Sequence, residues 1–502
     1  MEQTLHAFKK RLQEIAHVQS AMMMLEWDQS TYMPPAAAEA RGAQLSTLGK
    51  IVHQLSTDDR FGKWIEELTP YRESLPYDSD DAALIRHAKR DYERSSRVSE
   101  DYVSRSLKNA SETYNAWVAA RKADNFKLVE SQLEKTLDLS REYASFFPYE
   151  HIADPLIDRS DFGMKATTIQ SIFKELRDGL VPLVEEVTAQ SPIDASSVLQ
   201  HFPKNEQIQF GESVIKQLGF DFNRGRQDFA PHPFMIKFAH GDIRITTRVK
   251  EHDFTEAFFS TVHETGHALY ELGIDPNYEG TPLHSGTSMS VHESQSRLWE
   301  NIVGRSRGFW KHFYPQLQTA FPTQLSKTSL ESFYRAVNRV ERSLIRTDAD
   351  ELTYNLHVII RFDLELAMLE GKLSVKDLPE AWRSRYQSDL GISSPTDKDG
   401  VLQDIHWYMD SIGGSFQGYA LGNILSVQFF DAAVQAHPEI MAQIEKGEFS
   451  TLHSWLKQNI YQFGSKYTAD EIIKKATGKE MTIAPYLNYL DQKYRDIYLT
   501  GK

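Results

Sequence analysis

Two histidines four residues apart are the feature of this sequence most suited to chemistry. The run from residue 258 to 273 contains His263-Glu264-x-x-His267, so on a helix both imidazoles project from one face, one turn apart. Imidazoles in this arrangement suit Zn²⁺, which takes nitrogen ligands at about 2.0–2.1 Å. Glu264 leans to the same side and is the predicted general base for a water that the metal activates.

A third ligand has to come from another element, because zinc with two histidines takes a further His or carboxylate. Residues 291–300 have a helical pattern, and Glu293 is the best candidate there. His292 is an alternative ligand. Glu293 and Glu300 are equally compatible with solvated charges on a helix face, which most glutamates are. The spacing alone leaves the third ligand open.

The two histidines need a helix of defined length to hold them. Asp253 and Glu256 have the spacing of a capping box at its start, and Gly273 is placed to end it. Beside the histidine face runs an apolar stripe made of Phe258, Val262, Leu269 and Leu272. The sequence therefore predicts a capped helix that carries the motif, with an apolar stripe beside the histidine face.

Just before this helix, residues 233–249 depart from helical periodicity. Apolar side chains alternate on both sides of the turn formed by residues 240–242, which predicts an antiparallel hairpin. Helical periodicity dominates elsewhere and predicts helices at residues 81–96, 110–146 and 324–344, while residues 393–400 form the best loop candidate. We expect a mainly α-helical protein with a small antiparallel β-sheet, folded as a single domain over residues 1–502.

The composition of the chain bears on its possible binding partners and metal ligands. The chain has 502 residues, a net charge of -14 and no cysteine. Acidic chains make poor partners for nucleic acid or anionic membranes, so neither partner is expected. Without cysteine, a metal must be held by histidine and carboxylate. The first residues show no secretory signal, and a cytoplasmic protein is predicted.

Several separated motifs resemble those of the carboxypeptidase Taq family of metallopeptidases. They follow the family's order along the chain: Glu26-Trp27-Asp28-Gln29, Thr31-Tyr32-Met33-Pro34, His232-Pro233-Phe234, Asp242-x-Arg244-x-Thr246, the two-histidine motif, His292-Glu293-Ser294-Gln295, Ile345-Arg346-x-x-Ala349-Asp350 and Gly400-x-x-Gln403-Asp404-x-His406-Trp407. No motif position departs from the family pattern. The match extends from about residue 26 to residue 422 and is very specific.

The resemblance implies a metal-dependent carboxypeptidase that releases single C-terminal amino acids from peptides with broad specificity. It implies a helical fold with a deep substrate groove, similar to neurolysin and angiotensin-converting enzyme, and a homodimer. It assigns His263, His267 and Glu293 as the metal ligands and Glu264 as the catalytic base. Zn²⁺ is the expected metal, although Co²⁺ or Mn²⁺ can use the same ligands.

Peptide hydrolysis also needs donors for the oxyanion that develops on the scissile carbonyl. His406 and Tyr419 are the candidates. Tyr419 follows a glycine-rich run, residues 413–418, whose flexible backbone is expected to bring the phenol over the metal. The alternative for Tyr419 is a tyrosine packed in the core.

A carboxypeptidase must recognise a terminal carboxylate, and the planar fork of arginine matches both of its oxygens. Arg346 is the first candidate, with an intrahelical pair to Asp350 as the alternative. Arg244 and Gln403 are weaker candidates for the same end of the groove. His232 is expected to hold either the hairpin or the substrate.

Other interpretations share the same metal site. A zinc endopeptidase or a dipeptidyl carboxypeptidase would use identical ligands, and a non-enzymatic scaffold held by metal would need the ligands without Glu264. Trp27 and Asp28 fit packing as well as they fit the groove. The helices of residues 1–100 are expected to roof the groove and exclude folded proteins.

Overall fold

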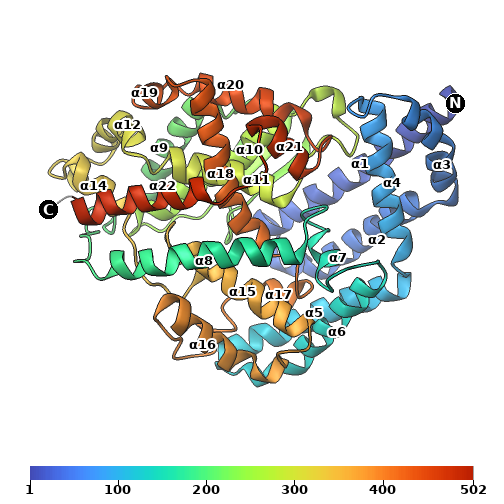
Figure 1. Ribbon diagram of the computed structural model, residues 1–502, viewed down its shortest axis with the longest axis horizontal. Coiled ribbons are helices and arrows are strands. Elements are labelled where there is room, and N and C mark those ends of the chain that lie inside the picture. The colour runs from blue at the N-terminus through green and yellow to red at the C-terminus, as the bar shows by residue number, and fades with distance from the viewer. Residues whose placement is uncertain (501–502) are drawn as a thin grey trace.

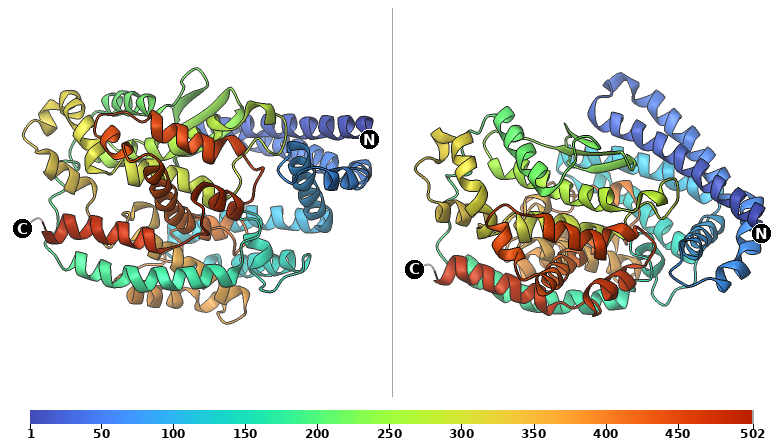
Figure 2. Two further views of the ribbon diagram at one scale, coloured as in Figure 1. Left: turned by 45° about the horizontal axis from the view of Figure 1, so that its top comes forward. Right: turned by 90° about the horizontal axis from the view of Figure 1, so that it is seen from above.

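The computed structural model describes residues 1–500, which fold into helices around one small sheet (Figure 1). The first part of the chain is a series of long helices: α1 (Glu2–Thr31), α2 (Ala38–Thr57), α3 (Asp59–Ser74), α4 (Asp80–Arg97), α5 (Glu100–Ala123) and α6 (Glu130–Ser145). Figure 2 shows α1 and α2 side by side as a hairpin along one side of the molecule. Among residues 1–500, no helix combines the length and the apolar character needed to cross a lipid bilayer.

The central part carries the sheet and α10 (Phe254–Gly273), the helix that packs on β2 (Met235–Ala239) and β3 (Asp242–Thr247). Its other elements are α7 (Asp154–Ile157), α8 (Ala166–Thr188), α9 (Lys204–Leu218), β1 (Gly225–Phe229) and α11 (Met289–Arg297), which continues into a π-helical turn, η4 (Leu298–Val303). The predicted hairpin is confirmed, since β2 and β3 pair antiparallel with Ile236 opposite Arg244. The sheet itself is mixed, because β1 pairs parallel with β3, in the order β1-β3-β2.

The last part packs against the central helices and completes the core. It comprises α12 (Arg307–Ala320), α13 (Pro322–Leu325), α14 (Leu330–Val337), α15 (Tyr354–Leu369), α16 (Leu378–Leu390), α17 (His406–Met409), α18 (Gln417–Ala436), α19 (Ile440–Ile444), α20 (Ser450–Asn459), α21 (Ala469–Thr477) and α22 (Ala484–Arg495). In Figure 1, α22 lies alongside α8, and the two helices are in contact.

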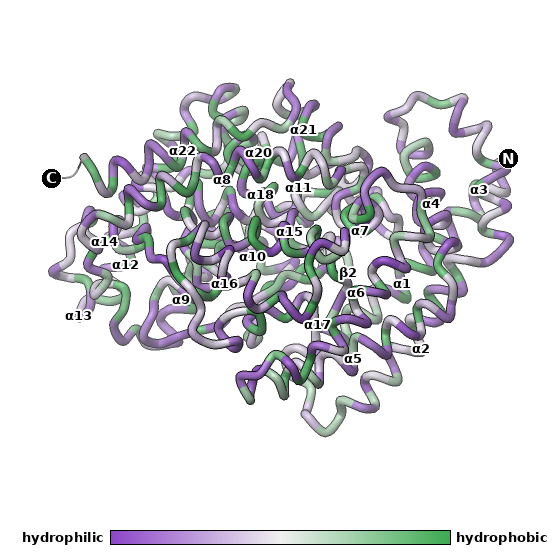
Figure 3. The backbone as a smooth tube through the Cα atoms, turned by 60° about the horizontal axis from the view of Figure 1, so that its bottom comes forward, coloured by the Kyte–Doolittle hydropathy of each residue, from purple (hydrophilic) through white to green (hydrophobic). Residues whose placement is uncertain are grey.

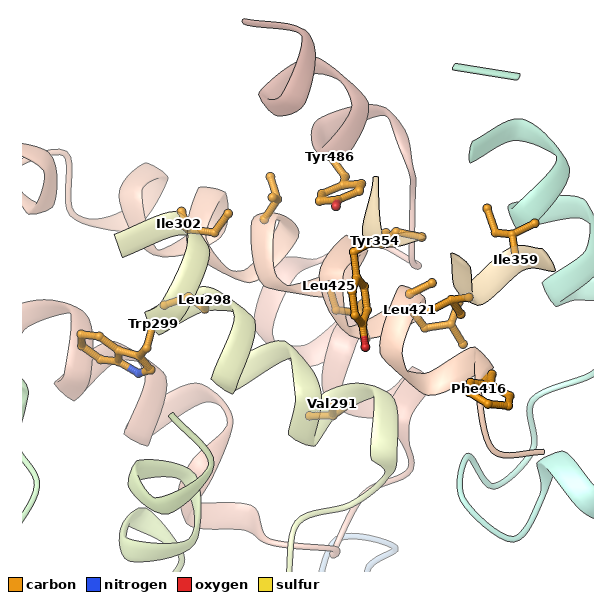
Figure 4. Close-up of a cluster of buried hydrophobic side chains, with 14 of the residues drawn as sticks. Val291, Leu298, Trp299, Ile302, Tyr354, Ile359, Phe416, Leu421, Leu425 and Tyr486 are labelled. Atoms are coloured by element: carbon orange, nitrogen blue, oxygen red, sulfur yellow. The ribbon is translucent and has the colours of Figure 1, made fainter. Parts of the chain in front are cut away.

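The core lies where α11, η4, α15 and α18 meet. Figure 4 shows Tyr354 of α15 beside Leu425 of α18, with Val291 of α11 below them, Tyr486 of α22 above them and Trp299 of η4 at the left edge. Trp299 and Leu425 are fully buried. Around the core, hydrophilic and hydrophobic segments alternate along the helices, as expected for helices with one apolar face (Figure 3). The buried centre holds α11 firmly against α18.

Two predicted helices are wrong in extent. The predicted helix 110–146 is two helices, because Asp124 takes a left-handed conformation with φ of 50° and ends α5. The predicted helix 324–344 is α13 and α14, where Ser329 accepts a hydrogen bond from the Ser332 N–H and starts α14 afresh, and the residues after Asn338 leave the helix. The predicted helix 81–96 matches α4, and residues 393–400 form the predicted loop.

Candidate metal centre and active site

The three predicted ligands meet at one point. Donor atoms of His263, His267 and Glu293 all lie within 4.8 Å of one another. Glu293 Oε2 lies 3.6 Å from His263 Nε2 and 3.4 Å from His267 Nε2. Two ligands about 2.1 Å from a tetrahedral ion are about 3.4 Å apart, so both spacings suit such an ion. The two imidazoles and one carboxylate fit a catalytic divalent metal, because three protein ligands leave a coordination position open.

Helix α10 presents the two imidazoles. Its N-terminus is capped by Asp253, whose carboxylate accepts a hydrogen bond of 2.9 Å from the Thr255 N–H. The capping box is wrong, because Glu256 turns instead to Arg248, whose Nε donates to it at 2.8 Å. The helix ends at Gly273, as predicted. The histidine motif therefore sits near the middle of a helix that is fixed at both ends.

Glycines on both sides of α11 place Glu293. Gly266 lies within the histidine motif, and a Cβ there would stand 2.6 Å from the carbonyl oxygen of Gln295. On the opposite side, a Cβ at Gly422 of α18 would stand 2.6 Å from Cβ and Cγ of Glu293. Only glycine allows backbones to approach so closely. Helix α11 is held between α10 and α18 at a depth that brings Glu293 to the histidines.

The Nδ1 atoms of His263 and His267, the ring nitrogens that do not face Glu293, also have hydrogen-bond partners. Glu300 Oε2 lies 2.9 Å from His263 Nδ1, and His292 Nδ1 lies 2.6 Å from His267 Nδ1. His292, the alternative ligand, therefore stands outside the donor cluster. Glu300 is buried, so its interpretation as a solvated charge is wrong, and the same holds for Glu293. Partners of this kind fix the tautomer and the orientation of a ligand imidazole.

Arg297 was missed by the sequence reasoning. Its Nε donates to Glu293 Oε1 at 2.7 Å, and its NH1 donates to Glu300 Oε2 at 3.0 Å. Burial opposes the charge on Glu293, but the Arg297 guanidinium and the neighbouring imidazoles hold the pKa of Glu293 well below its usual range. Only the i,i+4 spacing of Glu293 and Arg297 signalled this pair. The arginine occupies one carboxylate oxygen and leaves the other for a metal.

Glu264 faces a cavity beside the donor cluster. The cavity has a volume of about 610 Å³ and is also lined by His263, Glu293 and Tyr419. Glu264 is 6% exposed, and burial raises its pKa to about 7. A carboxyl group with a pKa near neutrality can both take and return a proton. A second cavity of about 510 Å³ touches His267, Glu293 and Tyr419, so the donor cluster lies between two hollows.

Tyr419 of α18 lines the cavity, and His406 of α17 contacts this tyrosine from outside the cavity lining. Tyr419 stands in the first turn of α18 rather than in a flexible run, although Gly413 and Gly414 before it have φ of 100° and 84°. His406 Nε2 lies 3.2 Å from the Tyr419 hydroxyl, and His406 Nδ1 lies 2.6 Å from Asp404 Oδ1. Tyr419 lines both cavities and is only half-buried, so its hydroxyl can reach a ligand.

Arg346 also lines the larger cavity, but its guanidinium is already engaged. Its Nε donates to Asp404 Oδ2 at 2.6 Å and its NH1 donates to the Tyr354 hydroxyl at 3.0 Å. The alternative pair with Asp350 does not form, because that carboxylate accepts from the Thr353 and Leu352 N–H groups. Arg346 NH2 also donates to Asp404 Oδ1 at 3.3 Å, so one hydrogen on NH1 and one on NH2 stay uncommitted. His232 lines the same cavity.

Two other predicted substrate residues lie outside the cavity lining. Arg244 donates to both oxygens of Asp242 and lies over the Trp27 ring at 4.4 Å. Gln403 accepts from the Arg346 N–H at 2.9 Å and so fixes that residue's backbone. Trp27 is buried under Arg244, and Asp28 pairs with an arginine of α2. These side chains support the sheet and the Arg346 segment.

A His-His-Glu donor cluster with a buried glutamate beside it, facing a cavity, defines a candidate hydrolytic metal centre. The family model of the carboxypeptidase Taq (M32) metallopeptidases matches residues 7–494. The chain is 36% identical to "Carboxypeptidase 1" of Bacillus subtilis, covering 99% of each chain, and 37% identical to "Thermostable carboxypeptidase 1" of Thermus thermophilus, covering 97% of each. The crystal structure of an M32 carboxypeptidase from Deinococcus radiodurans has a TM-score of 0.96 at 47% identity, covering 99% of both chains.

The chain belongs to the carboxypeptidase Taq family of metallopeptidases. Members of this family are metallocarboxypeptidases, which hydrolyse peptide bonds, so the predicted family and enzyme class are confirmed. The mainly helical architecture with a small sheet also matches the solved structures of the family.

Proposed function

We propose that this protein is a zinc-dependent carboxypeptidase that removes single amino acids from the C-terminus of peptides, with broad specificity. The observation that carries the proposal is the convergence of His263, His267 and Glu293 beside buried Glu264. Zn²⁺ is the proposed ion because two imidazoles and a carboxylate are its usual catalytic ligands. Co²⁺ or Mn²⁺ would use the same donors.

A divalent cation bound here supplies Lewis acidity, which activates a water molecule and polarises the scissile carbonyl. Glu264 takes the proton from the attacking water and delivers it to the leaving amine. The Tyr419 hydroxyl and His406 are the proposed donors to the developing oxyanion. Asp404 accepts from His406 Nδ1 and fixes the imidazole, so the Nε2 atom of His406 can donate to the oxyanion only while the ring is an imidazolium ion.

We place the terminal carboxylate of the substrate at the cationic corner of the cavity. Burial, together with the charges of Arg346 and Arg248, lowers the pKa of His232, so the three side chains lie in one region. Asp404 fixes the Arg346 fork and leaves one N–H on each terminal nitrogen for a substrate oxygen. Gln403 acts on this corner through the backbone of Arg346.

An endopeptidase or a dipeptidyl carboxypeptidase would share the metal centre, and the products separate these activities. An unstructured peptide of about ten residues is incubated with metal-loaded protein, once with a free and once with an amidated C-terminus. We expect a ladder of products in the mass spectrum, each one residue shorter, from the free peptide only. Internal cleavage, loss of residue pairs or equal cleavage of the amidated peptide would contradict the proposal.

The helices of residues 1–100 form the proposed roof over the approach to the site. Contact between α1 and β2 supports this role, where the Ser20 hydroxyl donates to the carbonyl oxygen of Phe238 at 2.6 Å. A roofed groove admits unfolded peptides, so rapid cleavage of a folded protein would count against it. We further propose the groove arrangement of neurolysin and angiotensin-converting enzyme, a homodimer and a cytoplasmic location. The mass of the protein in light scattering tests the homodimer.

A further inference from the structure

A relay of hydrogen-bonded side chains extends outward from His267. Its first member is His292 of α11, whose Nδ1 lies 2.6 Å from His267 Nδ1. The opposite nitrogen, His292 Nε2, lies 2.9 Å from Oε1 of Glu271, which is one turn beyond His267 on α10. Lys237 of β2 donates to the other oxygen of Glu271, and the Gly286 N–H donates to Oε1 at 2.9 Å. Glu271 is 3% exposed, so bulk water has little access to its oxygens.

The positions of the hydrogens follow from what each group can donate. Glu271 receives an ammonium and an amide N–H, so it is a carboxylate and only accepts. His292 Nε2 must therefore carry a hydrogen and donate it. In a neutral imidazole this leaves His292 Nδ1 with a lone pair, which accepts from His267 Nδ1–H. His267 then carries no hydrogen on Nε2, the nitrogen that faces Glu293.

We propose that Glu271 and Lys237 are positioning residues, which act through His292 to hold His267 in the tautomer that binds the metal. The inference rests on the proposed metal site and deepens it by naming what sets its affinity. The two ligand histidines differ in this respect, because His263 Nδ1 contacts a carboxylate directly, that of Glu300. His267 reaches its carboxylate through a second imidazole.

The substitution Glu271→Gln should reverse donor and acceptor in each hydrogen bond from residue 271 to His267. The Lys237 ammonium attracts the amide oxygen more strongly than the neutral Gly286 N–H does, so the NH₂ group turns toward His292 Nε2 and donates to it, and the Gly286 N–H loses its acceptor. His292 then carries its hydrogen on Nδ1 and donates to His267, whose own hydrogen moves to Nε2 and blocks the metal. We expect the dissociation constant for Zn²⁺, measured by competition with a chromophoric chelator, to rise about 10- to 100-fold.

A matched control is Glu279→Gln, which changes an exposed glutamate that accepts a hydrogen bond from the backbone of His240. Its zinc affinity should stay within about twofold of the unsubstituted protein. At saturating zinc, turnover of Glu271→Gln should return to within about threefold, because the relay affects occupancy of the site rather than the chemical step. Imidazole ¹⁵N spectra of the metal-free protein should show the His267 hydrogen on Nδ1, and on Nε2 in Glu271→Gln.

Lys237→Met offers a second variant at a half-buried position. It should also weaken zinc binding, whereas Lys237→Arg should preserve it, because arginine still donates to Glu271. Unchanged zinc affinity in either Glu271→Gln or Lys237→Met, with tight binding by the unsubstituted protein, would overturn the relay alone. Failure of the unsubstituted protein to bind zinc would instead overturn the proposed metal site.

Discussion

The close contact between Gly422 and Glu293 makes the substitution Gly422→Ala a specific test of how the site is held together. The new methyl group would stand 2.6 Å from Cβ and Cγ of Glu293, and normal carbon contacts need about 3.5–4.0 Å. The two helices must therefore separate by about 1 Å, or Glu293 must rotate away. Such overpacking costs about 1–3 kcal/mol. If this free energy is lost entirely from zinc binding, zinc affinity falls about 5- to 150-fold, since about 1.4 kcal/mol is a factor of ten.

The assay is the zinc dissociation constant by chelator competition, with the unfolding transition of the metal-free protein measured alongside. Gly418→Ala is the matched control, one turn earlier on α18. Its methyl group meets the side chain of Met289, with the nearest atom at 2.7 Å, and a flexible thioether can move aside. We expect less than about a threefold change there. Equal zinc affinity in Gly422→Ala and the unsubstituted protein would refute the idea that this contact places Glu293.

Three further predictions concern buried ionisable side chains. Burial raises the pKa of Glu365 from 4.5 to about 8, so the folded state holds a proton that the unfolded state releases between these values. The free energy of unfolding should fall as pH rises from about 5 to 8, and Glu365→Gln should remove this slope in urea titrations. Glu351→Ala leaves the buried Lys493 ammonium, now 2.5 Å from Glu351, without its partner and should cost about 3–5 kcal/mol of stability. Arg346→Lys loses the two-pronged contact to Asp404 and should lower kcat/KM about 10- to 100-fold, mainly by raising KM.

The Glu351 and Arg346 predictions each have a matched control variant, and the Glu365→Gln variant itself serves as the control for the pH slope. Glu341→Ala removes an exposed glutamate and should change stability by less than about 0.5 kcal/mol. Arg244→Lys alters an arginine that also pairs with a nearby aspartate but lies outside the cavity lining, and kcat/KM should change less than about threefold. A stability that is independent of pH in the unsubstituted protein, or a similar loss in both arginine variants, would contradict the respective prediction.

The local part of the site could be predicted from the sequence. The spacing of His263 and His267 on a helix, the cap at Asp253 and the β2–β3 hairpin depend on neighbouring residues, whose preferences are readable. The convergence of Glu293 with the histidines depends on how α10, α11 and α18 pack. The glycines that set this packing, Gly266 and Gly422, show their purpose only when the facing backbone is known.

The errors have similar causes. Helical periodicity continues across Asp124, and only the Asp124-Asn125 pair, typical of turns, signalled the break. Strand β1 is polar, with the sequence GRQDF, and forms because β3, which follows β2 in the chain, offers it a parallel edge. The alternative pair of Arg346 with Asp350 does not form, because the fold supplies Asp404 from another segment. Contacts with other segments decide the pairing of strand β1 and of Arg346, and local sequence patterns do not encode those contacts.

The most direct measurement of the central claim compares metal content and turnover in Glu264→Gln. The account predicts one zinc ion per chain in both proteins, because Glu264 is not among the three donors. It also predicts a loss of at least about 10³ in turnover, because the amide cannot accept the proton of the attacking water. Equal turnover in the two proteins, or loss of zinc from the variant, would contradict the assignment of Glu264 as the base beside a three-residue metal site.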